Sequence, residues 1–441
     1  MERAVSAFER ALYASDAVSA NNIVTIGRVE GPLADATLRR ALKRLQRRHP
    51  LLNVHIETDK DGGNPRFVSE GTARIGFRTL DQVRRGQVEA GWHSQAEFEL
   101  NSPFESDSGL AAPARIVALR SPEVGNGKSD GQGEGTDIMV TLSSHIGDAA
   151  SGVFLLQDLL RIAASDERNT GAMAERSPLD QMLPKGGRTS SGALGGWFKK
   201  PKKLELDAHV EYGDRRTRFI AKQLKPSETK ALIERCRAEK TTVNGALCAA
   251  VASALAADLE ERGTKKANVA LSATTNLREH IDPPLGDEVG PYAANAYLSL
   301  RTGKSETFWK MARDAQDQVG TNLARGEVFV DVRSKAEVAP QLLGADSKFI
   351  EQSQKRASTN VGVYNLGRLP IDDKIGPFTI RKLQFVTALP FTEYLRASVA
   401  THRDWLAFNL QFVEDAVHAG RAEHLAEQCV ESLLVAAGVR T

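Results

Sequence analysis

The sequence predicts an α/β or α+β protein with two lobes, each containing both helices and strands. Helical and strand-like patterns alternate along the whole chain of 441 residues, which is long enough for two or three domains of about 150 residues. A stretch rich in Pro, Gly and Ser, from about residue 175 to 203, separates two halves that both contain the two kinds of pattern. We therefore expect a first lobe over residues 1–185, a linker over 186–204 and a second lobe over 205–441.

The first lobe shows its clearest helix between residues 32 and 48. Apolar residues there recur at the spacing of one helix face, and Asp35 is the expected N-cap. These apolar residues are Leu38, Ala41, Leu42 and Leu45. Further helices are expected over 2–14 and 153–164, and strands over 21–29, around 55–56, over 115–119 and over 137–142.

The second lobe repeats this mixture of elements. Helices are expected to begin at Ser227 and Val243, and a final amphipathic helix covers 421–437. Strands are expected over 215–224, 269–274, 297–300, 398–401 and 405–413. The apolar run from Ala246 to Ala257 is shorter than the roughly 20 residues needed to cross a bilayer, so it predicts a buried helix.

Composition and charge exclude several classes of function. The chain has 58 Lys and Arg against 56 Asp and Glu, and a net charge of +2 gives no electrostatic footprint for nucleic acid. The three cysteines cannot form a disulfide framework, and Cys236 and Cys248 are expected to be small core residues. No apolar signal segment begins the chain and no membrane-spanning segment is expected, so we expect a cytoplasmic protein.

The segment from Ser143 to Gly152 is the most informative for chemistry. It joins an expected strand to an expected helix, and it places His145 where the two meet. A histidine held at such a turn suits a general base, which needs a fixed position and a pKa near the working pH. Asp148, three residues later, could orient the loop, cap the helix or pair with a cation. The simpler alternative is a histidine in a polar turn, with Asp148 as an N-cap.

This segment resembles the HHxxxDG motif of the chloramphenicol acetyltransferase-like superfamily. That superfamily includes the condensation domains of nonribosomal peptide synthetases, alcohol O-acetyltransferases and the phthiocerol dimycocerosyl transferases. Further segments resemble the family in the same order along nearly the whole chain. They are 38–54 (LRRALKRLQRRHPLLNV), 99–119 (ELNSPFESDSGLAAPARIVAL), 242–255 (TVNGALCAAVASAL), 276–292 with its Asn-Leu-Arg, Pro-Pro and Gly-Pro-Tyr, and 359–369 (TNVGVYNLGRL).

The resemblance implies two chloramphenicol acetyltransferase-like lobes, each a mixed sheet covered by helices, that form a V-shaped cleft and a tunnel. It also implies that an acyl thioester and an alcohol or amine acceptor meet there and react directly, without an acyl-enzyme, a metal or a bound cofactor. The donor would be acyl-coenzyme A or an acyl carrier protein, used as a co-substrate. A positioned base and an oriented acceptor supply much of what attack on a thioester needs. The family also favours a monomer.

Carried over by position, the resemblance makes His145 the base and Asp148 a structural acid paired with Arg278. It further implies that Ser144, Tyr364 and Asn365 contact the substrate. Simpler alternatives exist for these positions. Arg278 could form a local surface ion pair, Tyr364 could only pack, and Asn365 could serve a turn with Gly367.

The motif departs from the family pattern. With His145 as the base, Asp148 follows one residue too early, Ser144 takes the place of the first histidine and Ala149 that of the glycine. With Asp148 as the reference instead, the base position falls on Ser144 and His145 is its neighbour. Either His145 still reaches the position of the base despite the shorter turn, or the site binds ligands without catalysing a reaction. We expect the first, with transfer of an acyl group to a hydroxyl and formation of an ester. An amide-forming condensation enzyme and an inactive binding protein of a biosynthetic cluster are the alternatives.

Overall fold

A computed structural model describes most of the chain, and its contacts divide the chain into two compact units. The described residues are 1–59, 64–81, 90–104, 109–120, 135–165, 171–184, 201–264, 268–303, 306–342 and 347–440. Unit 1 comprises Met1–Met182, Arg278–Tyr292 and Leu369–Ala388. Unit 2 comprises Leu183–Leu277, Ala293–Arg368 and Leu389–Thr441. Most of the expected linker, residues 186–200, lies outside the described residues.

The two units differ from the contiguous lobes expected from composition. Two segments of the second half of the chain, Arg278–Tyr292 and Leu369–Ala388, make their contacts within unit 1. Composition shifts indicate linkers along the chain, but they do not show with which unit a segment makes its contacts. The physical reason for the second crossing is strand pairing, since both strands of Leu369–Ala388 join the sheet of unit 1.

Unit 1 contains one mixed six-stranded sheet, in the order β12-β13-β2-β7-β6-β5. Only the β5–β6 pair of this sheet is parallel. The strands of the sheet are β2 (Asn22–Glu30), β5 (Gly76–Asp81), β6 (Ala114–Arg120), β7 (Thr136–Ser143), β12 (Lys374–Ile375) and β13 (Phe378–Thr387). The helices of this unit are α1 (Ala7–Val18), α2 (Asp35–Arg48), α3 (Ala90–Asn101), α4 (Ala149–Ala164), α5 (Leu179–Met182) and the 3₁₀ turns η1 (Pro50–Leu52) and η4 (Arg278–His280).

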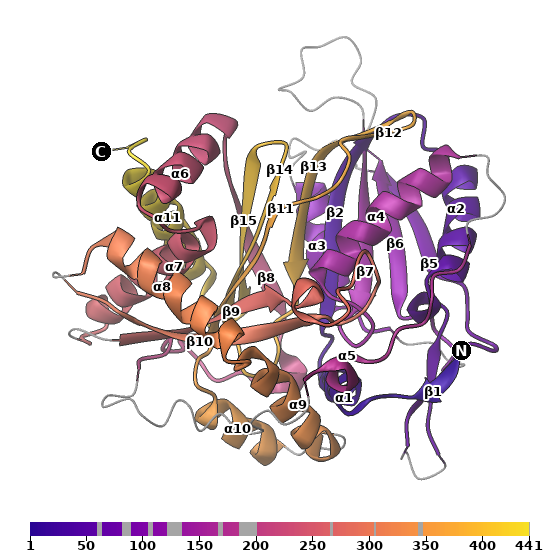
Figure 1. The fold of residues 1–441 in the computed structure, drawn as a ribbon, viewed down its shortest axis with the longest axis horizontal. Coiled ribbons are helices and arrows are strands. Elements are labelled where there is room, and N and C mark those ends of the chain that lie inside the picture. Colours follow the sequence, from indigo (N-terminus) through magenta and orange to yellow (C-terminus); the bar gives the residue numbers. More distant parts are fainter. Residues whose placement is uncertain are drawn as a thin grey trace. The chain divides into compact units, whose positions relative to one another are not determined.

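Helices α4 and α3 cover opposite faces of this sheet. Successive side chains of a strand point to alternate faces. On β2, Thr25 and Gly27 contact α4, whereas the Asn22 side chain donates to the backbone of α3 at 2.9 Å. Figure 1 accordingly shows α4 in front of the strands and α3 behind them. Helix α2 packs beside α4, so the front face carries two helices.

A small second sheet stands at the start of unit 1. Its strands β1 (Glu2–Ala4), β3 (His55–Glu57) and β4 (Arg66–Val68) pair in the order β1-β4-β3. The helix expected over 2–14 therefore begins later, at Ala7. Ser6 caps it, because the Ser6 hydroxyl accepts from the Glu9 amide and the Glu9 carboxylate accepts from the Ser6 amide.

Unit 2 is a second mixed six-stranded sheet with helices. The strand order is β10-β9-β11-β14-β15-β8, and β11 pairs in parallel with both β9 and β14. The strands are β8 (Thr217–Leu224), β9 (Asn268–Asn276), β10 (Ala293–Arg301), β11 (Val361–Arg368), β14 (Leu395–His402) and β15 (Trp405–Val413). The helices are α6 (Pro226–Ala238), α7 (Val243–Glu261), α8 (Phe308–Ala324), α9 (Val328–Leu342), α10 (Ser347–Arg356), α11 (Ala419–Ala436) and the turn η3 (Tyr212–Asp214).

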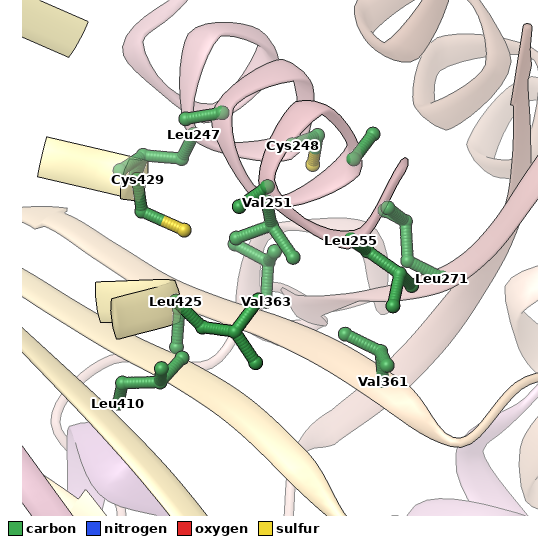
Figure 2. Packing of buried hydrophobic residues seen from close by; sticks show 14 of the residues in the cluster. Leu247, Cys248, Val251, Leu255, Leu271, Val361, Val363, Leu410, Leu425 and Cys429 are labelled. Carbon is green, nitrogen blue, oxygen red and sulfur yellow. The ribbon is translucent and has the colours of Figure 1, made fainter. Parts of the chain in front are cut away.

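The core of unit 2 lies between its sheet and the helices α7 and α11. Figure 2 shows Val251 of α7 next to Val363 of β11, Leu255 of α7 beside Leu271 of β9, and Leu425 of α11 near Val363. Among the described helices, α7 alone is long and apolar enough to span a membrane, but two thirds of that window is buried, as in a core helix.

The cysteines belong to this core rather than to any reaction centre. All three are free and buried, and Figure 2 shows Cys248 and Cys429 among the apolar side chains. Burial raises the pKa of the Cys236 thiol to about 11 and those of Cys248 and Cys429 to about 12. These thiols therefore stay protonated near neutral pH and are poor nucleophiles.

Two local predictions need correction. Asp35 is the first residue of α2 rather than its N-cap, which is Ala34. The Asp35 carboxylate instead accepts from the Thr79 hydroxyl at 2.7 Å and from Arg120 at 2.5 Å. The helix expected from Val153 begins at Ala149, because Asp148 caps it.

Candidate active site

The candidate site is built on the turn between β7 and α4. Strand β7 ends at Ser143, and the Ile146 amide closes the turn by donating to the Ser143 carbonyl at 3.1 Å. Asp148 then starts α4 as its N-cap, with its carboxylate accepting from the Ser151 amide at 2.8 Å. The turn holding His145 is therefore anchored at both ends, by a buried strand and by a capped helix.

The His145 ring is buried between two aromatic side chains. Its side chain is 7% exposed. The Phe67 ring of β4 stacks nearly parallel to it, with ring centroids 6.0 Å apart, and the Tyr13 ring of α1 meets it edge-on at 5.6 Å. These contacts restrict rotation of the imidazole, which is what a general base at the end of a short turn requires.

One nitrogen of the His145 ring is tied to a polar chain. His145 Nδ1 lies 2.6 Å from the Ser143 Oγ, and the Ser143 hydroxyl donates to Asp16 Oδ2 at 2.6 Å. The Asp16 carboxylate lies 3.9 Å from His145 Nδ1. Within the part of the chain that the structure describes, Nε2 of His145 has no hydrogen-bond partner.

Burial lowers the pKa of the His145 imidazole below its usual value, while the carboxylates of Asp16 and Glu9 oppose this shift. A lowered pKa keeps the ring neutral near pH 7, which is the form able to accept a proton. The site thus presents a neutral imidazole with one nitrogen held and the other without a hydrogen bond among the described residues.

Asp148 forms a buried bidentate ion pair with Arg278. The two guanidinium nitrogens Nη1 and Nη2 donate to Oδ2 and Oδ1 of Asp148 at 2.7 and 3.0 Å. Oδ2 also accepts from the Tyr292 amide at 3.1 Å. Arg278 is 3% exposed and lies over the rings of Phe154 and Tyr292, 5.5 and 5.0 Å from their centroids. Arg278 is therefore no surface ion-pair residue, and its pair with Asp148 holds the segment Arg278–Tyr292 in unit 1.

Ser144 and His145 lie together in the same turn. The Ser144 side chain is 9% exposed, and its Oγ is buried with no hydrogen-bond partner among the described residues. Its backbone amide is occupied, since it donates to the Asn21 carbonyl at 3.2 Å. A buried hydroxyl without a partner is costly, and a substrate contact for Ser144 remains a prediction.

Tyr364 and Asn365 belong to unit 2, on β11. Tyr364 is 4% exposed. The Asn365 side chain accepts from the Gly367 amide at 2.9 Å, and Gly367 has a φ of +67°, so this asparagine serves the turn at the end of the strand. A substrate contact for either residue remains a prediction.

Comparisons with known proteins agree with this architecture. Residues 213–375 match the family model described as phthiocerol/phthiodiolone dimycocerosyl transferase C-terminus. The structure is similar to the trichothecene 15-O-acetyltransferase TRI3 of Fusarium sporotrichioides, with a TM-score of 0.72, 11% identity, and coverage of 99% of this chain and 95% of that one. It is also similar to the first condensation domain of the calcium-dependent antibiotic synthetase, with a TM-score of 0.71, 16% identity and coverage of 100% and 97%. The chain has the condensation-domain fold.

A third similar structure is that of polyketide synthase associated protein 5 from Mycobacterium tuberculosis. Its TM-score is 0.64 at 14% identity, with coverage of 98% of this chain and 97% of that one. No curated protein matches the chain by sequence. The fold class predicted from the sequence, two mixed sheets with helices, is thereby confirmed, as is the resemblance to the superfamily.

Sequence reasoning missed four residues that shape this site within the condensation-domain fold. Asp16, Tyr13, Phe67 and Ser143 all contact the His145 ring or its hydrogen-bond chain. Ser143 was within the motif, but its position carried no signal of its own. Asp16 offered one weak signal, an acidic residue in the last turn of a helix, where the helix dipole disfavours a negative charge. Among the described residues, no cluster of His, Cys, Asp and Glu could hold a metal ion.

Proposed function

We propose that the protein is an acyltransferase that moves an acyl group from a thioester of coenzyme A or of an acyl carrier protein to a hydroxyl group. The observation that carries the proposal is the His145 ring, buried, held at Nδ1 and without a hydrogen bond at Nε2 among the described residues. The fold supports it, because relatives in fold include an O-acetyltransferase and a condensation domain. Fold alone does not decide function, so the site carries the argument.

The proposed reaction is a direct transfer. Nε2 of His145 removes the proton of the acceptor hydroxyl while the oxygen attacks the thioester carbonyl, and a tetrahedral oxyanion forms. When that intermediate collapses, the carbon–sulfur bond breaks and the new ester remains. The departing thiolate takes the proton from the His145 imidazolium and leaves as a free thiol. The base therefore returns to its starting form, and no covalent acyl-enzyme is needed.

The other predicted residues have supporting roles in this proposal. Asp148 and Arg278 keep the base in place by holding the start of α4, so we assign them a positioning role. The Ser144 hydroxyl, which lies beside the base, forms a hydrogen bond with the bound substrate. Tyr364 and Asn365 are proposed as substrate contacts from unit 2, on the resemblance alone.

The test is release of free thiol from a panel of acyl-coenzyme A donors, with mixed alcohols and amines as acceptors. We expect acceptor-dependent release by the wild-type protein and its loss in His145→Ala. A matched control is His209→Gln, which changes a histidine in unit 2 whose side chain is 56% exposed, and it should retain the wild-type rate. Mass spectrometry of the product then identifies an ester or an amide.

Other outcomes decide between the alternatives. An amide product would replace the proposed ester formation with a condensation reaction. Release that is unchanged in His145→Ala would contradict the assignment of the base. If coenzyme A thioesters give no release, the same acyl groups loaded on an acyl carrier protein are tested next. If neither donor class gives acceptor-dependent thiol release, the result would favour an inactive binding protein.

A further inference from the structure

The end of α1 meets the candidate site through a carboxylate. Asp16 lies in the last turn of α1, and its Oδ1 accepts from the Asn21 amide at 2.7 Å. Its Oδ2 accepts from the Ser143 hydroxyl at 2.6 Å. A carboxylate is electrostatically disfavoured at the C-terminal end of a helix, so helix formation does not explain this residue. Its two hydrogen bonds and its distance of 3.9 Å from His145 Nδ1 point to a role at the ring.

The positions of the protons in the hydrogen bonds that link Asp16, Ser143 and His145 follow from the number of donors. Ser143 has a single hydroxyl proton, and an ionised carboxylate can only accept. Because the Ser143 hydroxyl donates to Asp16, its oxygen has only lone pairs left for His145. The short contact of 2.6 Å between that oxygen and His145 Nδ1 is therefore a hydrogen bond only if Nδ1 carries the proton. Nε2 of the neutral ring is then the unprotonated nitrogen.

We propose that Asp16 and Ser143 form a hydrogen-bond relay that holds His145 in its Nδ1-protonated tautomer and leaves Nε2 as the basic nitrogen. Ser143 is completely buried, so water does not compete for its hydroxyl. The relay reaches the ring from α1 and β7 and is independent of the ion pair between Asp148 and Arg278. It supplies an orientation for the ring in a turn that is one residue shorter than the motif it resembles.

The charged groups around the ring support Asp16 as the effective carboxylate. Helix α1 brings Asp16, Glu9 and Tyr13 toward the imidazole. Glu9 is already engaged by Arg3 of β1, whose guanidinium also lies over the Phe67 ring at 4.9 Å from its centroid. Among the described residues, Asp16 forms no ion pair with an arginine or lysine, so no cation neutralises its charge near Ser143 and the ring. It stabilises the imidazolium formed when Nε2 accepts a proton.

The tautomer can be measured without any substrate. Nitrogen-15 NMR of the full-length protein with labelled histidine distinguishes the two ring nitrogens, and His145 is assigned by the signals lost in His145→Gln. We expect the wild-type ring to be protonated at Nδ1 above its pKa. In Asp16→Asn and Ser143→Ala we expect a mixture of tautomers. Ser144→Ala, which removes the neighbouring hydroxyl, should leave the wild-type tautomer.

The catalytic consequence rests on the proposed function and is tested separately. If the protein is an acyltransferase, Asp16→Asn should lower kcat by about tenfold to a hundredfold, a part of what a general base contributes. Removing the carboxylate also removes a group that raises the pKa of His145, so the rise of rate with pH should move to lower pH. If Asp16 had only a structural role, Asp16→Asn would lower the rate without shifting the pH at which the rate rises.

Both variants are checked for folding by circular dichroism before they are interpreted. The replacements are chosen to fit, since asparagine has the shape of aspartate and alanine is smaller than serine. A wild-type ring protonated at Nε2 would overturn the relay. So would a tautomer that stays the same in both folded variants. Because the NMR readout needs no reaction, a protein without transferase activity can still confirm or overturn the relay.

Discussion

Asp148 is the most heavily engaged carboxylate of the candidate site. It accepts hydrogen bonds from the Ser151 amide and hydroxyl, from the Tyr292 amide and from both Nη atoms of Arg278. The ion pair is almost fully excluded from water, so neither charge has an alternative partner in solvent. Loss of one charge leaves the other buried and uncompensated, which is far more costly than loss of a surface pair.

We predict that Asp148→Asn lowers the free energy of unfolding by about 3–5 kcal/mol, as expected when one partner of a buried pair is removed. Asparagine still caps α4, so the loss reports the missing charge. The measurement is urea-induced unfolding. Asp404→Asn is the control, because its pair with Arg368 has side chains 59% and 70% exposed, and its loss should cost less than about 1 kcal/mol. Equal effects of the two variants would contradict the structural role of Asp148.

At the residue scale, the local sequence predicts some of the roles of the site residues and gives no signal for others. The position of Asp148 before an apolar helix predicts an N-cap from the chain alone. Its partner Arg278 is 130 residues away, and only the resemblance indicated it. The contact between Asp16 and Ser143 spans 127 residues and has no motif, so it becomes visible only in three dimensions.

At the scale of elements, α4 approaches β2 unusually closely. A Cβ atom at Gly152 would lie 2.2 Å from the Thr25 Oγ1, and one at Gly27 would lie 2.4 Å from a methyl group of Leu156. The helix that carries the Asp148 cap can reach this position only because both surfaces lack a side chain there. The glycines thus help to place the start of α4, and with it the turn holding His145.

We predict that Gly152→Ala destabilises the protein by about 1–3 kcal/mol, because Thr25 is buried and branched and cannot move aside. Gly320→Ala is the matched control within α8, where nothing lies within 4 Å of the added Cβ. It should stabilise by about 0.5–1 kcal/mol through helix propensity. Thermal unfolding of both variants makes the comparison, and a stabilising Gly152→Ala would show that α4 can shift away from β2.

The elements predicted from the sequence were those with strong periodicity or β-branched runs. The strands β2, β6 and β7 and the helix α2 are of this kind. The sequence pattern did not separate β1 from α1, since the strand has only three residues and its pairing partner lies on β4. Helices α8, α9 and α10 were not predicted individually, although α8 carries Phe308, Met311, Ala312 and Ala315 at the spacing of one helix face.

At the scale of the whole molecule, unit 1 is assembled from three separate parts of the chain. Strand β13 pairs with β2 along eight residue pairs and lies between β2 and β12. The segment Arg278–Tyr292 supplies the only cation paired with Asp148 among the described residues. The N-terminal part of the chain therefore contains the turn with His145 but lacks two parts of the structure that supports it.

We predict that a fragment of residues 1–182 does not fold cooperatively by itself. It would leave β2 as an open edge and Asp148 without Arg278. Near-ultraviolet circular dichroism and thermal unfolding of the fragment should lack the signals of the full chain. A sigmoidal unfolding transition with native-like aromatic signals would instead mean that the contiguous first lobe expected from composition is a folding unit.

The central claim is that His145 accepts a proton during acyl transfer, and the pH dependence of acceptor-dependent thiol release tests it most directly. The active form is the neutral ring, so the rate should rise with pH through one ionisation below the usual histidine pKa of about 6.5 and then level off. His145→Gln should be at least about 100-fold slower at every pH. A His145→Gln protein that matches the wild-type rate and its pH profile would contradict the account.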